Sequence, residues 1–454
     1  MSLRALPRRV WWSLYLGYHV LGQARYPFRS AERIARDRDR NVQRIVAYAY
    51  RWVPYYRQTM DRLGLRPTDV RGFDDLRKLP LISVSDLQAD PAQFDSTEHP
   101  KSEMHRLDSS GSTGRPHSLW HDLASTYLDV AVSERESSIH RRIIGKGRRL
   151  VALGLASPIN ATSLRGTIRA NAIWPSRANM WRGAEETPLY TYDPPAKMLA
   201  VLNKRRPDIF YAYGSTMAML FAYAQRHNAA IHAPKIARYA SDALPPAVRQ
   251  MITEQYGTEV FSAYQSIEAP RMGFECEAHT GYHNNCDVYP VRIVDEAGAD
   301  CPPGVVGEVV VSNLVSHGTV LLNYRLGDRA SWATVPCTCG RQLPLISFPQ
   351  GRVTDDLVAT DGRRLDYPIV IVPMMRHPGV WQCQVTQHAL DSVTIALQLA
   401  PGTDSTLVER DLRAALQPLF GTDMHLNFEF DGDLQRTVAD KLRYVIREFE
   451  PPAL

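Results

Sequence analysis

A short segment rich in hydroxyl groups and glycine restricts the possible folds of this chain more than any other. It reads Ser109-Ser110-Gly111-Ser112-Thr113-Gly114-Arg115-Pro116. Glycine lets backbone amides approach an anion closely, the hydroxyls add donors and Arg115 adds positive charge, so the segment is typical of a phosphate-binding loop. The Walker spacing G-x-x-x-x-G-K-[ST] is absent, which argues against a P-loop NTPase and for a different nucleotide-binding fold. Taken alone, the segment also fits an ordinary surface turn.

Further motifs follow this loop in an order that one enzyme superfamily shares. They are Tyr264-Gln265-Ser266-Ile267-Glu268, Tyr324-Arg325-Leu326-Gly327-Asp328, Gly351-Arg352 before Asp355-Asp356, and Thr437-Val438-Ala439-Asp440-Lys441. Together they resemble the Y-G-x-T-E, Y-x-x-G-D, G-R-x-D-D and T-x-x-G-K motifs of the adenylate-forming ligases, which include acyl-CoA synthetases, adenylation domains and luciferases. The resemblance is strongest to the phenylacetate-CoA ligase branch and its capsule-biosynthesis homologues. It spans roughly residues 40 to 450.

The resemblance implies a site that uses ATP and Mg²⁺. The loop from Ser109 to Arg115 would hold the β- and γ-phosphates. Glu268 would bind Mg²⁺, which screens the pyrophosphate leaving group. Lys441 would be the catalytic lysine that neutralises charge on the bridging or carboxylate oxygens. Taken singly, such charged residues more often lie on a solvated surface, and their order along the chain is what favours function.

The remaining nucleotide contacts follow from the same resemblance. Tyr264 would stack on adenine, Asp328 would accept hydrogen bonds from the ribose hydroxyls, and Arg352 would reach the ribose or a phosphate. Asp355 or Asp356 would be the pivot about which a lid rotates after adenylation.

Several positions depart from the family motifs. Ile267 replaces a threonine whose hydroxyl would contact the α-phosphate, Gln265 replaces a glycine, and Asp440 replaces the glycine before Lys441. The segment 360–368 also lacks the G-x-N-x-x-P stretch of the family. These departures make the adenylation half of the reaction better supported than transfer to CoA.

A second set of residues suggests a metal site. Cys337 and Cys339 form a C-x-C, and Cys276 lies seven positions before His283. Four such ligands from two loops suit a closed, structural tetrahedral zinc, and phenylacetate-CoA ligase relatives look similar in this respect. Buried free thiols and disulfides are the alternatives. The competing ligands are His279 and Cys286.

The expected fold class is α/β, with two domains and a hinge. A large ATP- and substrate-binding domain with mixed sheets and flanking helices would span residues 1–350, a hinge 351–356, and a small α+β lid 357–454. Hydrophobic periodicity predicts one helix over 123–140 and strands over 149–155, 209–212, 260–264, 291–294 and 305–311. In the lid it predicts strands over 383–387, 392–397 and 426–430, a helix over 406–420, and a last helix after Lys441.

Charge and composition exclude some partners. The chain of 454 residues has 53 basic and 48 acidic side chains, a bias too weak to argue for nucleic acid. No apolar run is long enough to span a membrane. Arg4, Arg8 and Arg9 precede the apolar segment 11–21, which mimics a signal peptide but favours a helix packed on the large domain. Weak contact with a membrane surface is the alternative. We expect a cytoplasmic protein, with a homodimer possible.

The function that these motifs predict is an ATP-dependent ligase. It would activate a carboxylate, expected to be aromatic or otherwise planar, as an acyl-adenylate and transfer it to a thiol or an amine. CoA is the default acceptor of the family, and an amine is the alternative. Two rival functions remain: adenylation of another anion such as nitrite, as in diazotising relatives, and a nucleotide-binding regulator without turnover.

Overall fold

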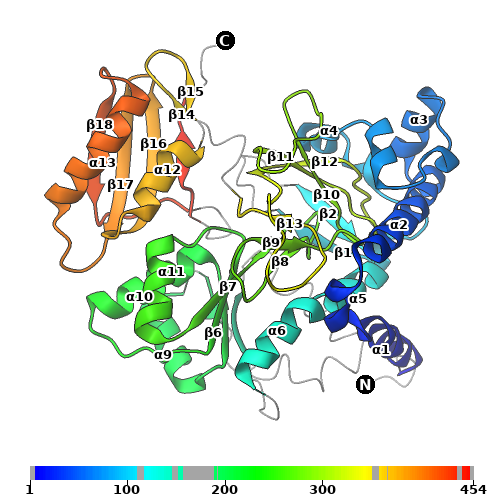
Figure 1. The fold of residues 1–454 in the computed structure, drawn as a ribbon, viewed down its shortest axis with the longest axis horizontal. Coiled ribbons are helices and arrows are strands. Elements are labelled where there is room, and N and C mark those ends of the chain that lie inside the picture. The colour runs from blue at the N-terminus through cyan, green and yellow to red at the C-terminus, as the bar shows by residue number, and fades with distance from the viewer. Residues whose placement is uncertain are drawn as a thin grey trace.

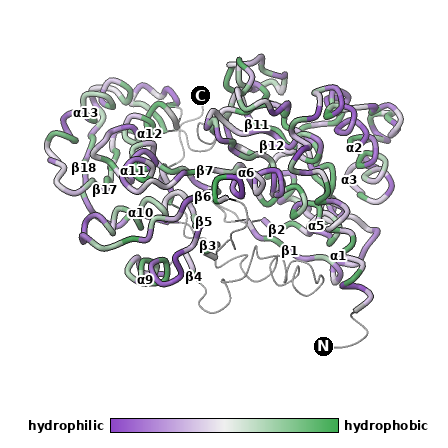
Figure 2. The backbone as a smooth tube through the Cα atoms, turned by 60° about the horizontal axis from the view of Figure 1, so that its bottom comes forward, coloured by the Kyte–Doolittle hydropathy of each residue, from purple (hydrophilic) through white to green (hydrophobic). Residues whose placement is uncertain are grey.

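The computed structural model describes residues 6–109, 117–145, 152–156, 189–191, 193–349, 357–365, 367–436 and 442–449. Figure 1 shows a large unit of mixed α/β structure beside a smaller unit made from the C-terminal residues. The N-terminal helices and the C-terminal unit lie at opposite ends of the molecule (Figure 2).

An eight-stranded mixed sheet is the centre of the large unit, with the order β13-β9-β8-β7-β6-β5-β3-β4. Strands β3 to β7 are parallel, whereas β8, β9 and β13 continue the sheet in antiparallel pairing. The strands are β3 Ala152–Ala156, β4 Leu189–Tyr190, β5 Ile209–Ala212, β6 Ile236–Ala240, β7 Glu259–Tyr264, β8 Gly273–Glu275, β9 Tyr282–Asn284 and β13 Leu345–Ile346. The strands predicted at 209–212 and 260–264 are confirmed.

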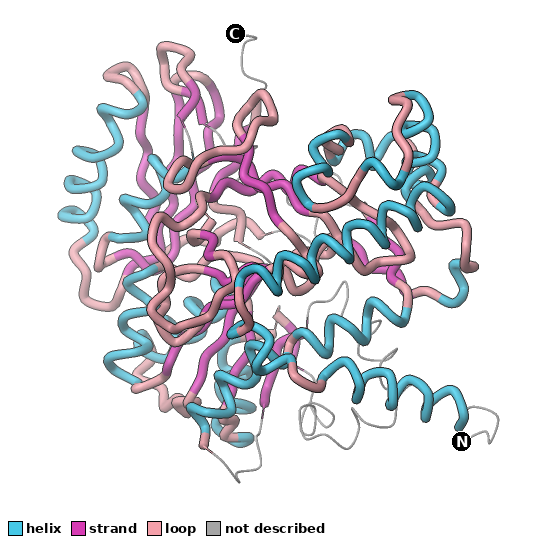
Figure 3. The backbone as a smooth tube through the Cα atoms, turned by 45° about the vertical axis from the view of Figure 1, so that its right-hand side comes forward, coloured by secondary structure: helices cyan, strands magenta, loops and turns pink. Residues whose placement is uncertain are grey.

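Helices cover both faces of this sheet (Figure 3). Side chains alternate along a strand, so Ile236 packs toward α6 Glu134–Ile144, and Ala237 packs toward α10 Gly214–Arg226 on the other face. Helices α9 Pro195–Arg205 and α11 Pro246–Tyr256 flank α10. Both begin with a proline at the first turn, where its missing N–H costs nothing.

The single helix predicted over 123–140 is wrong in its continuity. The structure has α5 Leu123–Val132 and then α6, with a break at Ser133. The Ser133 hydroxyl donates a hydrogen bond to the Val130 carbonyl oxygen at 2.6 Å. A serine that bonds back to its own helix competes with the regular backbone ladder, which accounts for a bend at this position.

The N-terminal part of the large unit packs helices on a second, three-stranded antiparallel sheet. Its elements are α1 Leu6–Val20, α2 Ala31–Trp52, α3 Pro54–Arg62, α4 Val84–Ala89, the hairpin β1 His105–Asp108 and β2 Ser118–His121, and the sheet β10 Val291–Val294, β11 Gly307–Val311 and β12 Tyr324–Ala330. The predicted strand at 305–311 begins two residues later than expected, because Gly304 turns the chain with φ of 84°. The part of the chain that the structure describes has no helix long and apolar enough to cross a membrane.

The C-terminal unit is a four-stranded sheet covered by two helices. Its elements are β14 Leu357–Val358, β15 Arg364–Leu365, α12 Tyr367–Arg376, β16 Val380–Ala389, β17 Ser392–Leu399, α13 Ser405–Phe420, β18 His425–Phe430 and β19 Val445–Arg447, with the sheet order β18-β17-β16-β19. Val408, Leu412 and Leu416 recur every four residues and bury one face of α13. The unit has its own buried core. The exact domain boundary stays a prediction, since the proposed hinge at 351–356 lies outside the described residues.

The last helix predicted after Lys441 is wrong. Residues 445–447 form β19, which pairs in parallel with β16 and completes the sheet. The run Tyr444-Val445-Ile446 is buried. β-Branched and aromatic side chains fit a pleated, buried surface better than a short helix.

The C-terminal sheet contacts the large unit directly. Trp381 on β16 is buried in the core formed by α9, α10 and α11. The Gln382 side chain donates to the Ser215 carbonyl oxygen at 2.6 Å, and the Tyr444 hydroxyl donates to the Ala243 carbonyl oxygen at 2.8 Å. These contacts place the ends of β16 and β19 beside the turns that follow β5 and β6.

Candidate functional site

The two ends of the phosphate loop are joined to each other and to the Glu268 segment. The Ser109 amide donates to the His117 carbonyl oxygen at 2.8 Å, and the His117 amide donates to the Ser109 hydroxyl at 2.8 Å. His117 Nε2 lies 2.8 Å from Glu268 Oε1. The hairpin of β1 and β2 therefore holds the loop next to Glu268. The loop residues between these ends, Ser110, Gly111, Ser112, Thr113, Gly114 and Arg115, lie outside the described residues.

Glu268 is held as a carboxylate in a buried position. Only 6% of the surface of Glu268 is exposed to solvent. Burial alone would raise the pKa of Glu268, but the hydrogen bond and charge of His117 lower it below the ordinary value. The Asn313 amide donates to the Glu268 carbonyl oxygen at 2.9 Å, which fixes the backbone. An ionised, oriented carboxylate is the form that binds Mg²⁺.

His117 is a site residue that sequence reasoning missed. It follows directly after Pro116 of the loop, but no family motif includes it. The only available signal was its position, because a histidine at the exit of a phosphate loop lies close to whatever the loop binds. Which partner it would meet depends on the tertiary fold.

Tyr264 and Asp328 meet although 64 residues separate them. The Tyr264 hydroxyl donates to Asp328 Oδ2 at 2.8 Å. Tyr264 is the last residue of β7, and ligands of open α/β sheets bind at the carboxyl ends of the strands. Asp328 lies on β12, where Gly327 has φ of 81° and the pairing with β11 shifts between Glu308 and Val310. Only glycine adopts this φ readily, so the Y-x-x-G-D motif encodes a bulge that turns Asp328 toward the site.

The remaining predicted site residues fall in gaps of the described chain. Lys441, Arg352 and the hinge residues Asp355 and Asp356 lie outside the described residues. The described flanks of the lysine loop are close together, because Arg436 and Leu442 form an antiparallel bridge. The roles of Lys441, Arg352, Asp355 and Asp356 stay predictions.

The structure brings the four predicted metal ligands together. The ligand atoms of Cys276, His283, Cys337 and Cys339 all lie within 4.8 Å of one another. Cys276 Sγ is 3.5 Å from Cys337 Sγ, and Cys339 Sγ is 3.2 Å from His283 Nε2. Cys276 follows β8 and His283 lies on β9, while the C-x-C loop precedes β13, which pairs with β9. Three sulfurs and one imidazole at this spacing fit a tetrahedral zinc.

The protonation state of the histidine suits a metal ligand. Burial lowers the pKa of His283 to about 4, so the ring is neutral near neutral pH. Its Nδ1 lies 3.4 Å from the Leu343 carbonyl oxygen, which favours a proton on Nδ1 and leaves Nε2 free for a metal. Of the two competing ligands, His279 is bound to Glu275 at 2.8 Å, and Cys286 is not in the cluster.

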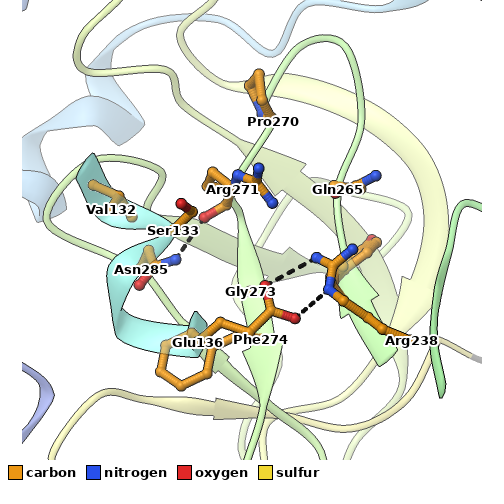
Figure 4. A pocket seen from close by; sticks show the side chains of 12 residues that line it. Val132, Ser133, Glu136, Arg238, Gln265, Pro270, Arg271, Gly273, Phe274 and Asn285 are labelled. Atoms are coloured by element: carbon orange, nitrogen blue, oxygen red, sulfur yellow. Dashed lines mark hydrogen bonds and ion pairs between the residues drawn. The ribbon is translucent and has the colours of Figure 1, made fainter. Parts of the chain in front are cut away.

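A small charged pocket lies beside Tyr264. Residues from α6, β6 and β8 and from the segment after β7 line it, among them Glu136, Arg238, Gln265 and Arg271. Figure 4 shows Arg238 joined to Glu136 by two contacts. None of these positions except Gln265 belongs to a motif singled out in the sequence.

No family model matches the chain. The chain is 25% identical to the phenylacetate-coenzyme A ligase of Thermus thermophilus over 405 residues, which cover 86% of this chain and 83% of that protein. It is 21% identical to the protein CapK of Staphylococcus aureus over 253 residues, which cover 55% of each.

Solved structures show the same fold. The 2-hydroxyisobutyryl-CoA ligase in its postadenylation state, in complex with R3-HIB-AMP, gives a TM-score of 0.73 at 18% identity and covers 92% of this chain and 90% of that chain. The same ligase in its thioesterification state, with 2-HIB-AMP and CoA, gives a TM-score of 0.58 at 20% identity, with 92% and 91% coverage. The predicted fold class is therefore confirmed. The chain is thus similar in sequence to a phenylacetate-coenzyme A ligase and to CapK, and in fold to an acyl-CoA ligase, which agrees with the resemblance that the ordered motifs carry.

Proposed function

We propose that this protein uses ATP to activate a carboxylic acid as an acyl-adenylate and then transfers the acyl group to the thiol of coenzyme A. In the first step a carboxylate oxygen attacks the α-phosphorus of ATP, the bond from that phosphorus to the bridging oxygen breaks, and pyrophosphate leaves. In the second step the sulfur attacks the acyl carbonyl carbon, its proton is lost, and AMP leaves. The observation that carries the proposal is the meeting of separate motifs at the carboxyl end of β7.

That meeting assigns roles to the described residues. Asp328, held by the Tyr264 hydroxyl, would accept hydrogen bonds from the ribose, and the Tyr264 ring would pack on adenine. Glu268 would bind Mg²⁺ next to the phosphate loop, with His117 orienting its carboxylate. Bound Mg²⁺ would screen the charge of the leaving pyrophosphate.

The lid lysine and the loop arginine complete the proposal. Lys441, on the C-terminal unit, would stabilise charge that develops in the transition state, and Arg115 and Arg352 would contact phosphate or ribose. Lys441 belongs to the smaller unit. Rotation of that unit about the 351–356 hinge would therefore bring the lysine into the site for adenylation and take it out again. The higher TM-score against the postadenylation state is consistent with a lid seated for the first step, but the likeness itself concerns the fold.

Zinc would have an architectural role. Cys276, His283, Cys337 and Cys339 would bind one Zn²⁺ and hold the β8–β9 turn to the loop before β13. All six cysteines are free thiols, which suits the cytoplasmic location that we propose for an enzyme using ATP and CoA.

A pyrophosphate-release assay tests the function. Purified protein is given ATP, Mg²⁺ and one member of a panel of aliphatic and aromatic acids, with nitrite as a separate member. We expect pyrophosphate with at least one carboxylic acid, and a mass corresponding to its acyl-adenylate. ATP binding without pyrophosphate from any member would favour the nucleotide-binding regulator, and release with nitrite alone would favour the diazotising function.

The acceptor is tested separately. The active acid is presented with CoA or with hydroxylamine, and the product is identified by mass spectrometry. A saturable acyl-CoA signal supports the thiol acceptor. Departures in the motifs, such as Asp440 beside Lys441, leave an amine as the alternative, which only the hydroxamate arm would report.

A further inference from the structure

The small pocket beside Tyr264 is lined by three charged side chains. The space enclosed between its walls is small, about 10 Å³, which is room for about one water molecule, and Arg238, Arg271 and Glu136 lie among the lining residues. Tyr264 and Gln265 also line the pocket, and Gln265 lies three residues before Glu268 in the sequence. An acid bound beside this pocket, with its reacting carboxylate toward the nucleotide, would place its other end against these charged groups.

One arginine of the pocket is already neutralised. Arg238 forms a two-point ion pair with Glu136, through Nε to Oε1 and through Nη2 to Oε2 at 2.9 Å. Both carboxylate oxygens of Glu136 are therefore occupied. A two-point pair of this kind is geometrically rigid and leaves Glu136 little capacity to serve a second cation.

The other arginine has no such partner. Within the described residues, no hydrogen bond or ion pair reaches the guanidinium of Arg271, although its carbonyl oxygen accepts from the Asn285 amide at 2.7 Å. Burial and the neighbouring charge of Arg238 lower the pKa of Arg271. Asp129 is the other nearby acid, but it accepts a hydrogen bond from Tyr289, and burial raises its pKa to about 7. A partly buried cation without a full counterion is costly unless a ligand supplies the anion.

We propose that the acid substrate carries a second anionic group, most simply a second carboxylate, which binds the half-buried Arg271 beside this pocket. Gln265 lines the same pocket, and its side-chain amide is a further donor to that group. Arg271 is thus a specificity-determining residue that selects dianionic acids. The inference rests on the proposed adenylation function and narrows its substrate class.

Matched pairs of acids test this assignment. Pyrophosphate release is measured with glutarate against butanoate and with phthalate against benzoate, for the wild type, Arg271→Leu and Arg271→Lys. We expect the wild type to prefer the diacids, and Arg271→Leu to lose about 100-fold in kcat/KM for them, mostly through KM, while monoacids change little. Arg271→Lys should recover part of the loss. Arg62→Leu, an exposed arginine on α3, is the control.

The outcomes separate this inference from the function itself. Release with monoacids only, at equal rates in the wild type and Arg271→Leu, would overturn the second-anion assignment while leaving adenylation intact. No release with any acid would instead remove the proposed function. Nitrite-dependent release that Arg271→Leu abolishes would assign Arg271 to the reacting anion, which also overturns the second-anion assignment.

A separate observation concerns α1 at the edge of the molecule. One side of this helix packs on α5, where Leu16 is buried and Trp12 stacks on Tyr127. The other side leaves an exposed stripe, the α1 stripe, of Val10, Trp11, Leu14, Tyr18 and Leu21, with exposures from 42% to 79%. Trp11, Leu14, Tyr18 and Leu21 follow one another at spacings of three or four residues, Val10 lies next to Trp11, and Leu21 comes directly after the helix, so together they make one apolar face.

The positive charge of the N-terminal residues indicates which kind of surface would bind the α1 stripe. Residues 1–31 contain five arginines and no acidic residue, whereas the rest of the chain balances at 48 basic and 48 acidic. Two copies facing each other would bring like charges together. We infer that the α1 stripe binds an anionic membrane surface, because arginine with tryptophan and leucine on one helix is the pattern of an interfacial helix.

Vesicle sedimentation tests this surface. We expect the protein to sediment with phosphatidylcholine vesicles that contain phosphatidylglycerol, to bind about tenfold less to phosphatidylcholine alone, and to lose binding in a Trp11→Ser/Leu14→Ser variant. Leu407→Ser on α13, also an exposed leucine, is the control. Equal sedimentation of the wild type and the double variant would refute the inference. So would a dimer, seen by light scattering, that the double variant abolishes without any vesicle binding.

Discussion

The proposed nucleotide side and the proposed acid pocket of the site adjoin each other but are built differently. Glu268 and Asp328 on the nucleotide side belong to short motifs, and each motif sets its own local geometry, as the bulge at Gly327 does for Asp328. The charged residues of the acid pocket, Glu136, Arg238 and Arg271, come from a helix, a strand and a loop and form no motif.

This difference indicates that contacts to ATP are encoded in local motifs, whereas contacts to the acid depend on the tertiary fold. ATP presents the same atoms to every member of the superfamily, so a few local segments can hold it. The acid differs from enzyme to enzyme, and its contacts come from side chains that only the assembled sheet brings together. Variants on the nucleotide side should therefore affect all acids alike, whereas variants in the pocket should discriminate among them.

The largest expected effect is on the nucleotide side. Lys441→Ala should lower the rate of adenylate formation by about 10³-fold or more for every acid, because it removes charge stabilisation in the transition state. ATP binding, measured by calorimetry, should change little. A loss confined to one class of acid would move Lys441 to the acid side and break the comparison.

The zinc cluster should stabilise the proposed acid pocket, because both include residues on or next to β8. Gly273 and Phe274 line the pocket, and Cys276 follows at the end of the same strand. Cys339→Ser should remove about one zinc per chain and destabilise the fold by several kcal/mol, on the order of 3 kcal/mol or more. Elemental analysis and thermal unfolding measure both.

The control for the zinc variant is Cys301→Ser, a cysteine outside the cluster. It should retain the zinc and the melting temperature. A zinc-free wild type of normal stability would leave the four residues as an unmetallated cluster.

Asp328→Ala should weaken ATP binding by about 10- to 100-fold, since it removes an acceptor that ribose hydroxyls use in both ground and transition states. The effect should be the same for every acid. Tyr264→Phe is the matched variant: it keeps the ring and removes the hydroxyl that forms the 2.8 Å bond to Asp328, at a cost of about 1 kcal/mol. Unchanged nucleotide affinity in Asp328→Ala would take this residue out of the site.

A further prediction concerns Asp129, a buried carboxyl whose charge acts on Arg271 of the pocket. Burial raises the pKa of Asp129 to about 7, above its ordinary value of 3.8. At pH values between 3.8 and 7, the Asp129 carboxyl is therefore protonated in the folded state and ionised in the unfolded state. Asp129 lowers the free energy of unfolding by an amount that grows as the pH rises from 4 to 7. Asp129→Asn should stabilise the protein at pH 8 by on the order of 2 kcal/mol and have little effect at pH 4. Denaturant unfolding at both pH values measures this, and an equal effect at both would contradict the buried titration.

Local pattern predicted much of the secondary structure, and its failures have a common cause. The amphipathic helix at 406–420 and the strand ending at Tyr264 were visible as periodicity, because each buries one face or a continuous run. The break at Ser133 depends on one side-chain hydrogen bond, and β19 depends on pairing with β16 about 60 residues earlier. Neither leaves a periodic signal.

The sequence by itself determined the adenylate-forming fold, the ordered nucleotide motifs and the four candidate zinc ligands, because residue type and spacing set their backbone conformation and ligand chemistry. Only the tertiary structure decided that His117 meets Glu268, that Tyr264 meets Asp328, and that Arg238 pairs with Glu136 while Arg271 forms no ion pair with any residue that the structure describes. Coulomb energy and hydrogen bonding depend on distances between atoms, and the order of residues along a chain does not fix those distances until the sheet is assembled.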